Sequence, residues 1–168
     1  MATNTVRKAK RSQFMAFLNT TPAADTPNWA RFGKGITGQT VNYNPQVTTE
    51  NYIDQDNADT NVDSYQPQIP TPQTVYKGDP CFDFVDALRK RRAVGDDCKT
   101  QVLMVNAYED AVDGAYSAEL NEAAIQIDDF GGEGGQALVI NFTVNLNGDP
   151  TEGTFAPDSK AFTPTTGN

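Results

Sequence analysis

Residues 138–146 alternate between core-type and other side chains, the pattern of a strand with one buried face and one wet face. The positions assigned to the core are Leu138, Ile140, Phe142, Val144 and Leu146, and the intervening positions are Val139, Asn141, Thr143 and Asn145. The dipeptide Asn147-Gly148 follows, and it is typical of a hairpin turn that needs positive φ angles. We therefore expect residues 151–155 to return as the antiparallel partner of this strand.

Further short strands are predicted on the N-terminal side of this segment. They cover residues 13–18, 40–44 with pairing continuing over 46–53, 101–108 and 123–128. In the last of these, Ile125 and Ile127 share one face, and Gln126 and Asp128 share the other. Prolines at positions 67, 70 and 72 make the intervening segment extended and poorly suited to a central strand.

One helix is predicted, over residues 79–93. Pro80 occupies the first helical position, and the apolar side chains that follow gather on one broad face. Acidic residues lie toward its N-terminus and four basic residues, 89–92, toward its C-terminus, which complements the helix dipole, and Gly95 is the expected stop. Many short strands with one helix predict a mainly β fold: an antiparallel β-sandwich or barrel of two packed sheets flanked by one α-helix.

The length of 168 residues predicts one domain, because chains of about 100–200 residues usually build a single core. Within this single domain, 1–168, we expect a basic N-terminal arm over residues 1–13, a long acidic loop over 50–65 and an extended C-terminal arm over 156–168. Only 38% of the residues are hydrophobic, which is low for a globular domain. This deficit indicates long polar segments, or a subunit whose partners complete its burial.

Charge is distributed unevenly along the chain. Residues 1–34 carry six basic and one acidic side chain, which gives +5, whereas residues 35–168 carry seven basic and 21 acidic side chains, which gives −14. Four basic residues of the arm lie close together: Arg7, Lys8, Lys10 and Arg11. The arm is a solvated terminus, a nucleic-acid contact, or a segment that docks on an acidic surface of another copy. The acidic remainder disfavours nucleic-acid binding, because it repels phosphate.

The chain has no histidine, which excludes several kinds of enzyme site. Ser-His-Asp and Cys-His nucleophile pairs and His-ligated zinc all need that side chain. Asp128 and Asp129 are adjacent, and on a regular strand they point to opposite faces, so they do not form an acid–base couple. We therefore expect no enzymatic activity and no catalytic residue.

Two patterns resemble ligand sites, but the residues around them do not fit such sites. Residues 33–38 match the G-x-G-x-x-G pattern of nucleotide sites, but a strand pattern follows where a helix is required, so we interpret the glycines as a bend. Asp54, Asp56 and Asp59 are spaced as clustered carboxylates, but Tyr65 stands where an EF-hand needs glutamate. An adventitious weak cation site is one interpretation of these three residues, and a solvated or subunit-contacting loop is the simpler one. We expect no metal and no cofactor.

The chain lacks sequence signals for a membrane or for secretion. No apolar run approaches the roughly 18 residues that span a bilayer, and no signal-like stretch follows the N-terminus. We expect a protein made and kept in a cytoplasm, with Cys81 and Cys98 as free thiols.

Four stretches, taken in order, resemble the tail tube protein, also called the major tail protein, of long-tailed bacteriophages. They are residues 29–36 (WARFGKGI), 50–58 (ENYIDQDNA), 76–92 (YKGDPCFDFVDALRKRR), and 125–135 (IQIDDFGGEGG) followed by 142–155. None of them is a chemical signature by itself. The resemblance comes from their order and spacing, and it spans nearly the whole chain.

This resemblance implies a virion protein, assembled in the host cytoplasm, with two packed β-sheets and one helix. It also implies hexameric rings that stack into a hollow tail tube, with a long loop bridging successive rings. DNA would pass through the lumen during ejection without specific binding, and a tape-measure protein would occupy it during assembly. Tail terminator and distal tail proteins are further implied partners.

The resemblance gives two sets of residues an expected role. The candidates to face the lumen are Gln126, Asp128, Asn141, Thr143 and Asn145. An acidic wall there would repel phosphate and keep DNA from sticking. The acidic residues of the loop between rings are Glu50, Asp54, Asp56, Asp59 and Asp63. The basic arm of a neighbouring ring is one candidate partner for this loop.

Other functions are compatible with this composition. The inner-tube subunit of a contractile tail or injection machine shares the implied architecture. A small ligand-binding β-barrel would be expected to stay monomeric, and a hydrolase would need convergent polar groups in a pocket, which the sequence does not indicate.

Overall fold

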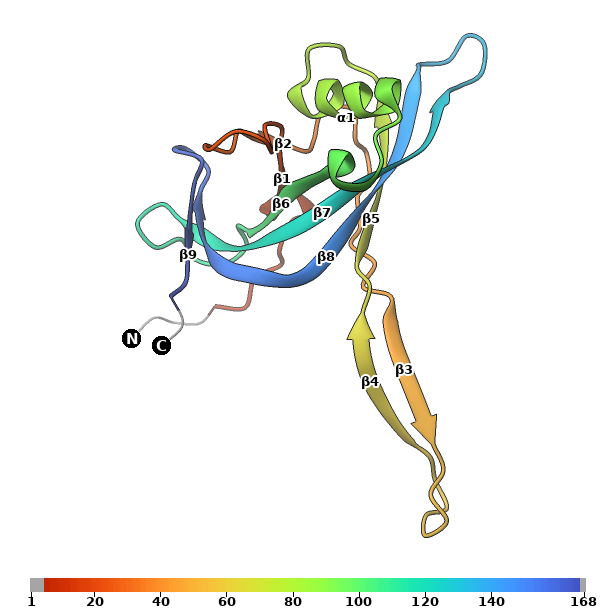
Figure 1. Ribbon diagram of the computed structural model, residues 1–168. Helices are drawn as coiled ribbons and strands as arrows, with labels where there is room; N and C mark the ends of the chain where they lie inside the picture. The colour runs from red at the N-terminus through yellow and green to blue at the C-terminus, as the bar shows by residue number, and fades with distance from the viewer. Residues whose placement is uncertain (1–4, 167–168) are drawn as a thin grey trace. The chain divides into compact units, whose positions relative to one another are not determined.

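The computed structural model describes residues 5–166, and this range is mainly β, with one α-helix and two short 3₁₀ helices (Figure 1). The strands are β1 (Phe14–Asn19), β2 (Trp29–Arg31), β3 (Pro45–Glu50), β4 (Asp59–Tyr65), β5 (Gln68–Thr74), β6 (Lys99–Asn106), β7 (Tyr116–Gly131), β8 (Val139–Ala156) and β9 (Ala161–Pro164). The helices are η1 (Arg11–Gln13), α1 (Pro80–Arg91) and η2 (Gly95–Cys98). Within residues 5–166, no helix has both the length and the apolar character needed to cross a bilayer.

The strands form two sheets. One has the order β2-β1-β6-β7-β8-β5, with β9 also paired to β8, and the other consists of β3 and β4. Pairing is antiparallel between β1 and β2, β1 and β6, β5 and β8, β8 and β9, and β3 and β4. The predicted fold class is confirmed: mainly β, with two sheets, antiparallel pairing and one α-helix.

The chain divides into two compact units. Unit 1 comprises the described residues of Met1–Phe32, Thr100–Glu122 and Gly148–Asn168, and unit 2 comprises Gly33–Lys99 and Ala123–Asn147. Strands β7 and β8 contribute residues to both units. That the chain forms a single domain stays a prediction.

The core of unit 1 is built around an aromatic pair. The ring centroids of Phe17 on β1 and Phe155 on β8 are 4.8 Å apart, with the ring planes inclined at 53°, in the range that aromatic pairs prefer. Further buried members of this core are Trp29, Leu103, Val105 and Ala118. Residues 102–105 of β6 are all buried, as its continuous apolar run predicts.

In unit 2, the side chains of β5 and β8 sort into two faces. The pairs on the buried face are Ile69 with Val144, Thr71 with Phe142, and Gln73 with Ile140. The pairs on the opposite face are Gln68 with Asn145, Pro70 with Thr143, and Pro72 with Asn141. The alternation predicted for this segment is confirmed with two exceptions: Leu138 precedes β8 and is exposed, and Thr143, predicted on the wet face, is buried.

The prolines of β5 explain why it is the last strand of its sheet. The backbone N–H of Gln68 donates to Asn42 O at 2.8 Å and that of Thr74 to Gly35 O at 2.9 Å, both away from β8. Peptide N–H groups alternate in direction along a strand, so Pro70 and Pro72 face the same outer edge. Since proline has no N–H, the ladder between β5 and β8 loses no hydrogen bond.

Helix α1 begins as the sequence predicts and ends earlier. The side chain of Asp79 accepts a hydrogen bond from the Phe82 N–H at 3.1 Å, and Pro80 follows it at the first helical position. The helix ends where Arg92 adopts a left-handed conformation, with φ 48°, whereas Gly95 begins η2. Its buried residues are Cys81, Phe82, Val85 and Leu88.

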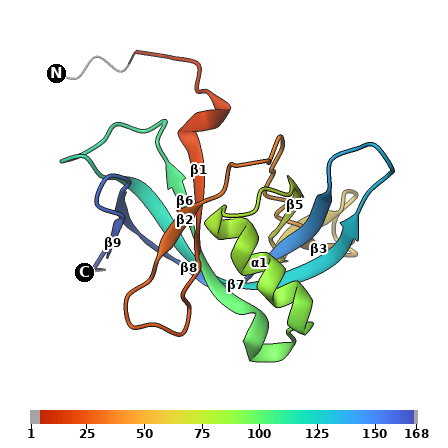
Figure 2. The same cartoon turned by 90° about the horizontal axis from the view of Figure 1, so that it is seen from above.

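Two contacts place α1 across the sheet of unit 2, as Figure 2 shows from above. At its start, Gln73 Nε2 on β5 donates to Asp79 Oδ2 at 3.2 Å. In its last turn, the guanidinium of Arg89 stacks on Phe130 of β7. Because β8 lies between β5 and β7 in the sheet order, the helix crosses β8 from one neighbour to the other.

The turn predicted at Asn147-Gly148 is wrong, because β8 continues through it to Ala156. Gly148 has φ 66°, whereas Asn147 does not have a positive φ, and one such residue can bend a strand without reversing it. The chain reverses over residues 157–160, where the Lys160 N–H donates to Ala156 O at 2.7 Å. Strand β9 then returns along β8, so the predicted C-terminal arm contains a strand.

Two other expectations are corrected. Residues 40–44 form no strand and contribute one isolated bridge, between Asn42 and Gln68. Residues 50–65, expected to be a loop, include β4, which pairs with β3 to make a hairpin. A segment with no buried face can still form strands, because cross-strand hydrogen bonds do not require one. The predicted arms extend into residues 1–4 and 167–168, which lie outside the described residues.

Candidate functional site

The polar side chains that were predicted to share a wet surface lie together on the open face of unit 2. Thr143 Oγ1 donates to Asp128 Oδ2 at 2.7 Å, and Gln126 Nε2 donates to Asp128 Oδ1 at 2.6 Å. Asn145 Nδ2 donates to Gln126 Oε1 at 3.4 Å, so β7 and β8 are linked side chain to side chain. Whether this surface lines a lumen stays a prediction.

Asp129 joins the same surface, which the sequence did not predict. Its Oδ1 accepts a hydrogen bond from Asn141 Nδ2 at 2.7 Å. Asn141 and Thr143 are two residues apart on a regular part of β8, so the two adjacent carboxylates bond to one face of that strand. The expectation that Asp128 and Asp129 point to opposite faces is therefore wrong. The available signal in the sequence was the glycine pair 131–132, because glycine in a strand often marks a bulge or another irregularity.

We call Gln126, Asp128, Asp129, Asn141, Thr143 and Asn145 the polar face. Among residues 5–166, the side chains that bond to its two carboxylates are neutral amides and a hydroxyl. The carboxylates are therefore held in place while their negative charge stays uncompensated by a cation. Such a surface repels polyanions, and it carries no lysine or arginine to bind phosphate.

The β3–β4 hairpin has two chemically different faces. A bulge makes Asp63 the extra residue of β4, because Gln46 pairs with Ser64 while Val47 pairs with Val62. The bulge returns Tyr65, which pairs with Pro45, to the face that carries the two valines. We call Pro45, Val47, Val62 and Tyr65 the apolar face. The acidic face carries Glu50, Asp59 and Asp63.

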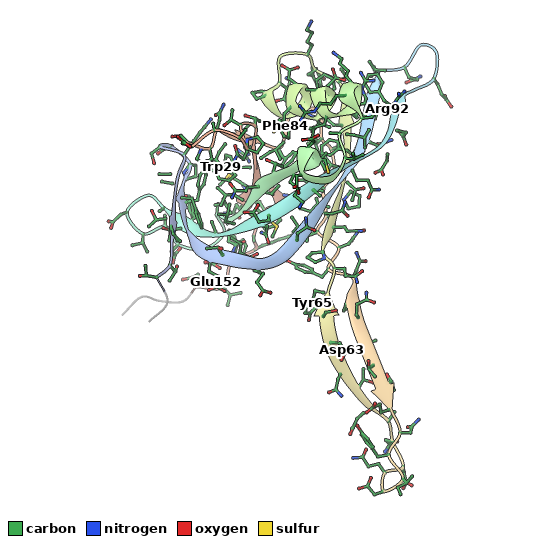
Figure 3. The ribbon with its side chains drawn as sticks, viewed as in Figure 1. Trp29, Asp63, Tyr65, Phe84, Arg92 and Glu152 are labelled. Atoms are coloured by element: carbon green, nitrogen blue, oxygen red, sulfur yellow. The ribbon has the colours of Figure 1, made fainter. Side chains whose placement is uncertain are left out.

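Every residue of β3 and β4 is exposed, including the large apolar ones. Val47, Val62 and Tyr65 keep 55%, 54% and 59% of their surface accessible, and Tyr43 stacks edge-on against Tyr65 with 6.3 Å between ring centroids. Figure 3 shows Tyr65 at the base of the hairpin and Asp63 farther along it. Contiguous exposed apolar surface is typical of sites that bind a protein, a membrane or a ligand.

The other side of the hairpin and its tip are strongly acidic. Residues 45–65 contain five acidic side chains and no basic one, so their formal charge is −5. Asp63 accepts a hydrogen bond from Thr48 across the strands. Tyr52 donates to Glu50, and this bond raises the pKa of the tyrosine, with a smaller contribution from burial. The predicted loop residues therefore form one acidic surface: Glu50, Asp59 and Asp63 on the strands, and Asp54 and Asp56 at the tip.

Backbone hydrogen bonds fix the base of the hairpin to unit 2. Gln66 N–H donates to Tyr43 O at 3.0 Å, and Asn44 Nδ2 donates to Gln66 O at 3.0 Å. One step farther on, Leu146 N–H from β8 donates to Pro67 O at 3.0 Å. The hairpin therefore projects from a fixed base.

The described part of the basic arm makes contacts within its own unit. Arg7 Nη2 donates to Tyr108 O at 3.0 Å and to Asp110 Oδ1 at 2.9 Å. Arg11 Nη1 donates to Phe14 O at 2.7 Å. Lys8 and Lys10 are exposed. Pairing of this arm with an acidic loop of a neighbour stays a prediction.

A second basic cluster lies in the last turn of α1. The carboxylate of Asp86 forms ion pairs with Arg89 Nη2 at 2.7 Å and with Lys90 Nζ at 3.0 Å. Partial burial opposes ionisation of Asp86, but the hydrogen bonds from Lys90 and Arg89 outweigh it and lower the pKa of this carboxyl. Arg91 Nη2 donates to Asp97 O at 3.2 Å, and among residues 5–166 the side chain of Arg92 meets no partner. We call Arg91 and Arg92 the basic end of α1.

The glycines at 33–38 form a bend, as predicted, with no helix after them. Gly35 has φ 77°, and a Cβ there would lie 2.4 Å from Thr74 O, so only glycine fits. Lys34 Nζ lies 4.7 Å from the ring centroid of Tyr76.

Neither cysteine is bonded to another, and no metal site is assembled in the described range. Burial raises the pKa of Cys81, with Asp79 adding to the effect, so this residue stays a thiol. Cys98 Sγ donates to Gly95 O at 3.1 Å. Within residues 5–166, no three cysteine, aspartate or glutamate side chains gather as metal ligands, Asp54, Asp56 and Asp59 included.

Comparison with known proteins gives a structural likeness but no match by sequence. No family model and no curated protein matches the chain. Among solved structures, a chain in the cryo-EM structure of the anti-feeding prophage baseplate, six-fold symmetrised, is 14% identical with a TM-score of 0.46. The match covers 90% of this chain and 97% of that one.

Proposed function

We propose that this chain is a structural, non-enzymatic subunit of a phage-tail-like particle, and that it assembles with copies of itself into stacked hexameric rings. The stacked rings form the hollow tube through which DNA is ejected. The order of four sequence stretches that resemble tail tube proteins supports this proposal. Two separate surfaces also support it: the exposed hairpin, which assembly would require, and the polar face, which passage of DNA would require.

The observation that carries the proposal is the exposed hairpin. Its residues bury nothing in their own chain, yet its apolar face presents Val47, Val62 and Tyr65 to solvent from a fixed base. A monomeric protein gains nothing from this arrangement, because exposed apolar surface promotes association. In the proposed tube the hairpin reaches a subunit of the next ring and is buried there.

The polar face supports the proposed lumen. It holds Asp128 and Asp129 in fixed positions without a cationic partner, beside the neutral side chains of β8. A wall with this chemistry lets a phosphate backbone pass without binding it, since tight binding depends on arginine and lysine contacts. A tape-measure protein in the lumen, and tail terminator and distal tail proteins at the tube ends, are the partners that this function requires.

Two other functions compete with this one. The inner-tube subunit of a contractile tail would use the same surfaces, and it differs in having a sheath, which is another protein. A small ligand-binding β-barrel is the candidate of a different class, and it would leave the exposed hairpin without a purpose.

Negative-stain electron microscopy of the purified chain tests the proposal. We expect rings or hollow tubes, with longer tubes at higher protein concentration. A chain that stays monomeric in sedimentation velocity at all accessible salt and protein concentrations would contradict it. Mixing the chain with its sheath candidate and looking for decorated tubes separates the contractile alternative from the non-contractile one.

A further inference from the structure

Unit 2 carries oppositely charged surfaces at its two ends. The hairpin leads into the first residue of β5, and α1 follows shortly after the last. Seven residues of strand span roughly 20 Å at about 3.3 Å per residue, so β5 holds the two elements apart. In Figure 3, Asp63 and Arg92 lie at opposite ends of this unit.

The surface at the helix end combines charged and apolar side chains, as the hairpin does, but its charge is positive where that of the hairpin is negative. Residues 89–92 are four consecutive cations, of which Asp86 compensates part, and Arg92 lacks a side-chain partner in the described range. Apolar side chains lie beside them: Val94 is 76% exposed and Phe130, beneath Arg89, is 38% exposed. An acidic and apolar hairpin therefore has a basic and apolar counterpart on the same unit.

The basic arm is a weaker match for the hairpin. Arg7 is already bonded to Asp110, and Arg11 is bonded to Phe14. The arm also belongs to unit 1, whereas the hairpin and α1 are fixed to one another through unit 2. A repeated contact between copies needs two patches whose relative position is constant, and the hairpin and the helix end belong to the same unit.

We propose that the hairpin of one copy docks on the basic end of α1 in a second copy, with the acidic residues Asp59 and Asp63 facing Arg91 and Arg92. The inference rests on the proposed self-assembly and names the two patches that would make it. The contact joins different patches on the two copies, so each copy keeps one free hairpin and one free helix end, and the assembly grows.

Charge reversal tests this pairing. We expect Asp59→Lys with Asp63→Lys, and separately Arg91→Glu with Arg92→Glu, to raise the concentration needed for assembly at least about tenfold, because like charges then meet. The four-substitution variant should return this concentration to within about threefold of wild type. The matched control, Lys8→Glu with Lys10→Glu in the arm, should change it less than threefold. All these residues are exposed, so circular dichroism should show folded proteins throughout.

Photo-crosslinking gives a second readout that needs no tube. Asn61→p-benzoylphenylalanine puts a photoreactive ring on the acidic face, between Asp59 and Asp63, and mass spectrometry of crosslinked dimers identifies the peptide reached. We expect peptides from residues 88–99, and crosslinks to residues 5–11 would overturn the inference in favour of the arm. If wild type assembles but the four-substitution variant gives no rescue, the pairing is wrong while the proposed function stands. If wild type gives neither assemblies nor crosslinked dimers, both are wrong.

Discussion

The guanidinium carbon of Arg89 lies 4.0 Å from the centroid of the Phe130 ring. The same guanidinium bonds to Asp86, which holds the cation over the ring and joins the last turn of α1 to the end of β7. We expect Phe130→Leu to lower the free energy of unfolding by about 0.5–1.5 kcal/mol, measured by urea denaturation, because a partly exposed cation–π contact contributes about 0.5–1 kcal/mol.

A double-mutant cycle separates this contact from simple loss of apolar surface. Arg89→Leu combined with Phe130→Leu should show a coupling free energy above about 0.5 kcal/mol. Lys90→Leu is the control, because Lys90 also bonds to Asp86 and no contact joins it to Phe130. If the coupling free energy of Lys90 with Phe130 equalled that of Arg89 with Phe130, Phe130 would be responding to the charge of the helix in general.

Asp86 makes the stability of unit 2 depend on pH in the acid range. Its folded pKa lies below the unfolded value of about 3.9, so its stabilisation is complete above that value and is lost as pH falls through the folded pKa. Allowing for solvent screening, we expect Asp86→Asn to cost about 0.5–1 kcal/mol at pH 7. Wild type and variant should converge as pH drops from about 4 toward 2 in denaturant titrations. Asp158→Asn, at an exposed carboxylate, is the control for the loss of one negative charge.

Gly153 is required by the approach of β9. A Cβ there would lie 2.3 Å from Thr163 O and 2.7 Å from the Phe162 ring, although the backbone itself has no positive φ. We expect Gly153→Ala to destabilise the protein by about 1–3 kcal/mol, because backbone on both strands must move. Gly134→Ala is the matched control, since a Cβ there would meet nothing within 4 Å. Thermal unfolding of the two variants measures the difference, and equal melting temperatures would contradict the expectation.

Features fixed by local chemistry were predictable from the sequence. The alternation in residues 139–146 identified the two faces of β8, and with them most of the polar face. Asp79 and Pro80 located the start of α1, because capping needs only neighbouring residues. Pro70 and Pro72 argued correctly against a central strand, since a missing N–H has the same consequence in any fold, although the edge strand β5 itself was not predicted.

Features that depend on partners distant in the sequence were not predictable. Asn147-Gly148 has the composition of a turn, but continued pairing extends β8 through it. Asp129 joined the polar face because β7 departs from strict alternation there, which no residue pattern required. The bulge at Asp63 likewise brings Tyr65 beside Val62, although their odd spacing would put them on opposite faces of a regular strand.

Reversing the charge of the polar face should make assembled protein retain DNA. We expect wild-type assemblies to leave double-stranded DNA unbound at low salt, and Asp128→Lys with Asp129→Lys to bind it in a manner reversed by added salt. The control Asp97→Lys with Asp158→Lys changes the net charge equally, at residues that are not part of the polar face. Co-sedimentation with labelled DNA measures both. If the control retained DNA equally, net charge would explain the result and the polar face would have no special role.

Glu119 on β7 should make unit 1 less stable at neutral pH than at mildly acidic pH. Burial raises the pKa of this carboxyl, and the neighbouring charge of Glu152 raises it further. The folded state therefore binds the proton more tightly than the unfolded chain, so the penalty is present above the folded pKa and disappears as pH falls below the unfolded value of about 4.3. Because the side chain is partly exposed, solvent screening should limit the gain from Glu119→Gln to a few tenths of a kcal/mol at pH 7. Denaturant titrations from pH 7 to pH 4 should show this gain shrinking toward zero, and Glu122→Gln, at an exposed carboxylate bonded to Gln101, is the control for the loss of one negative charge on β7.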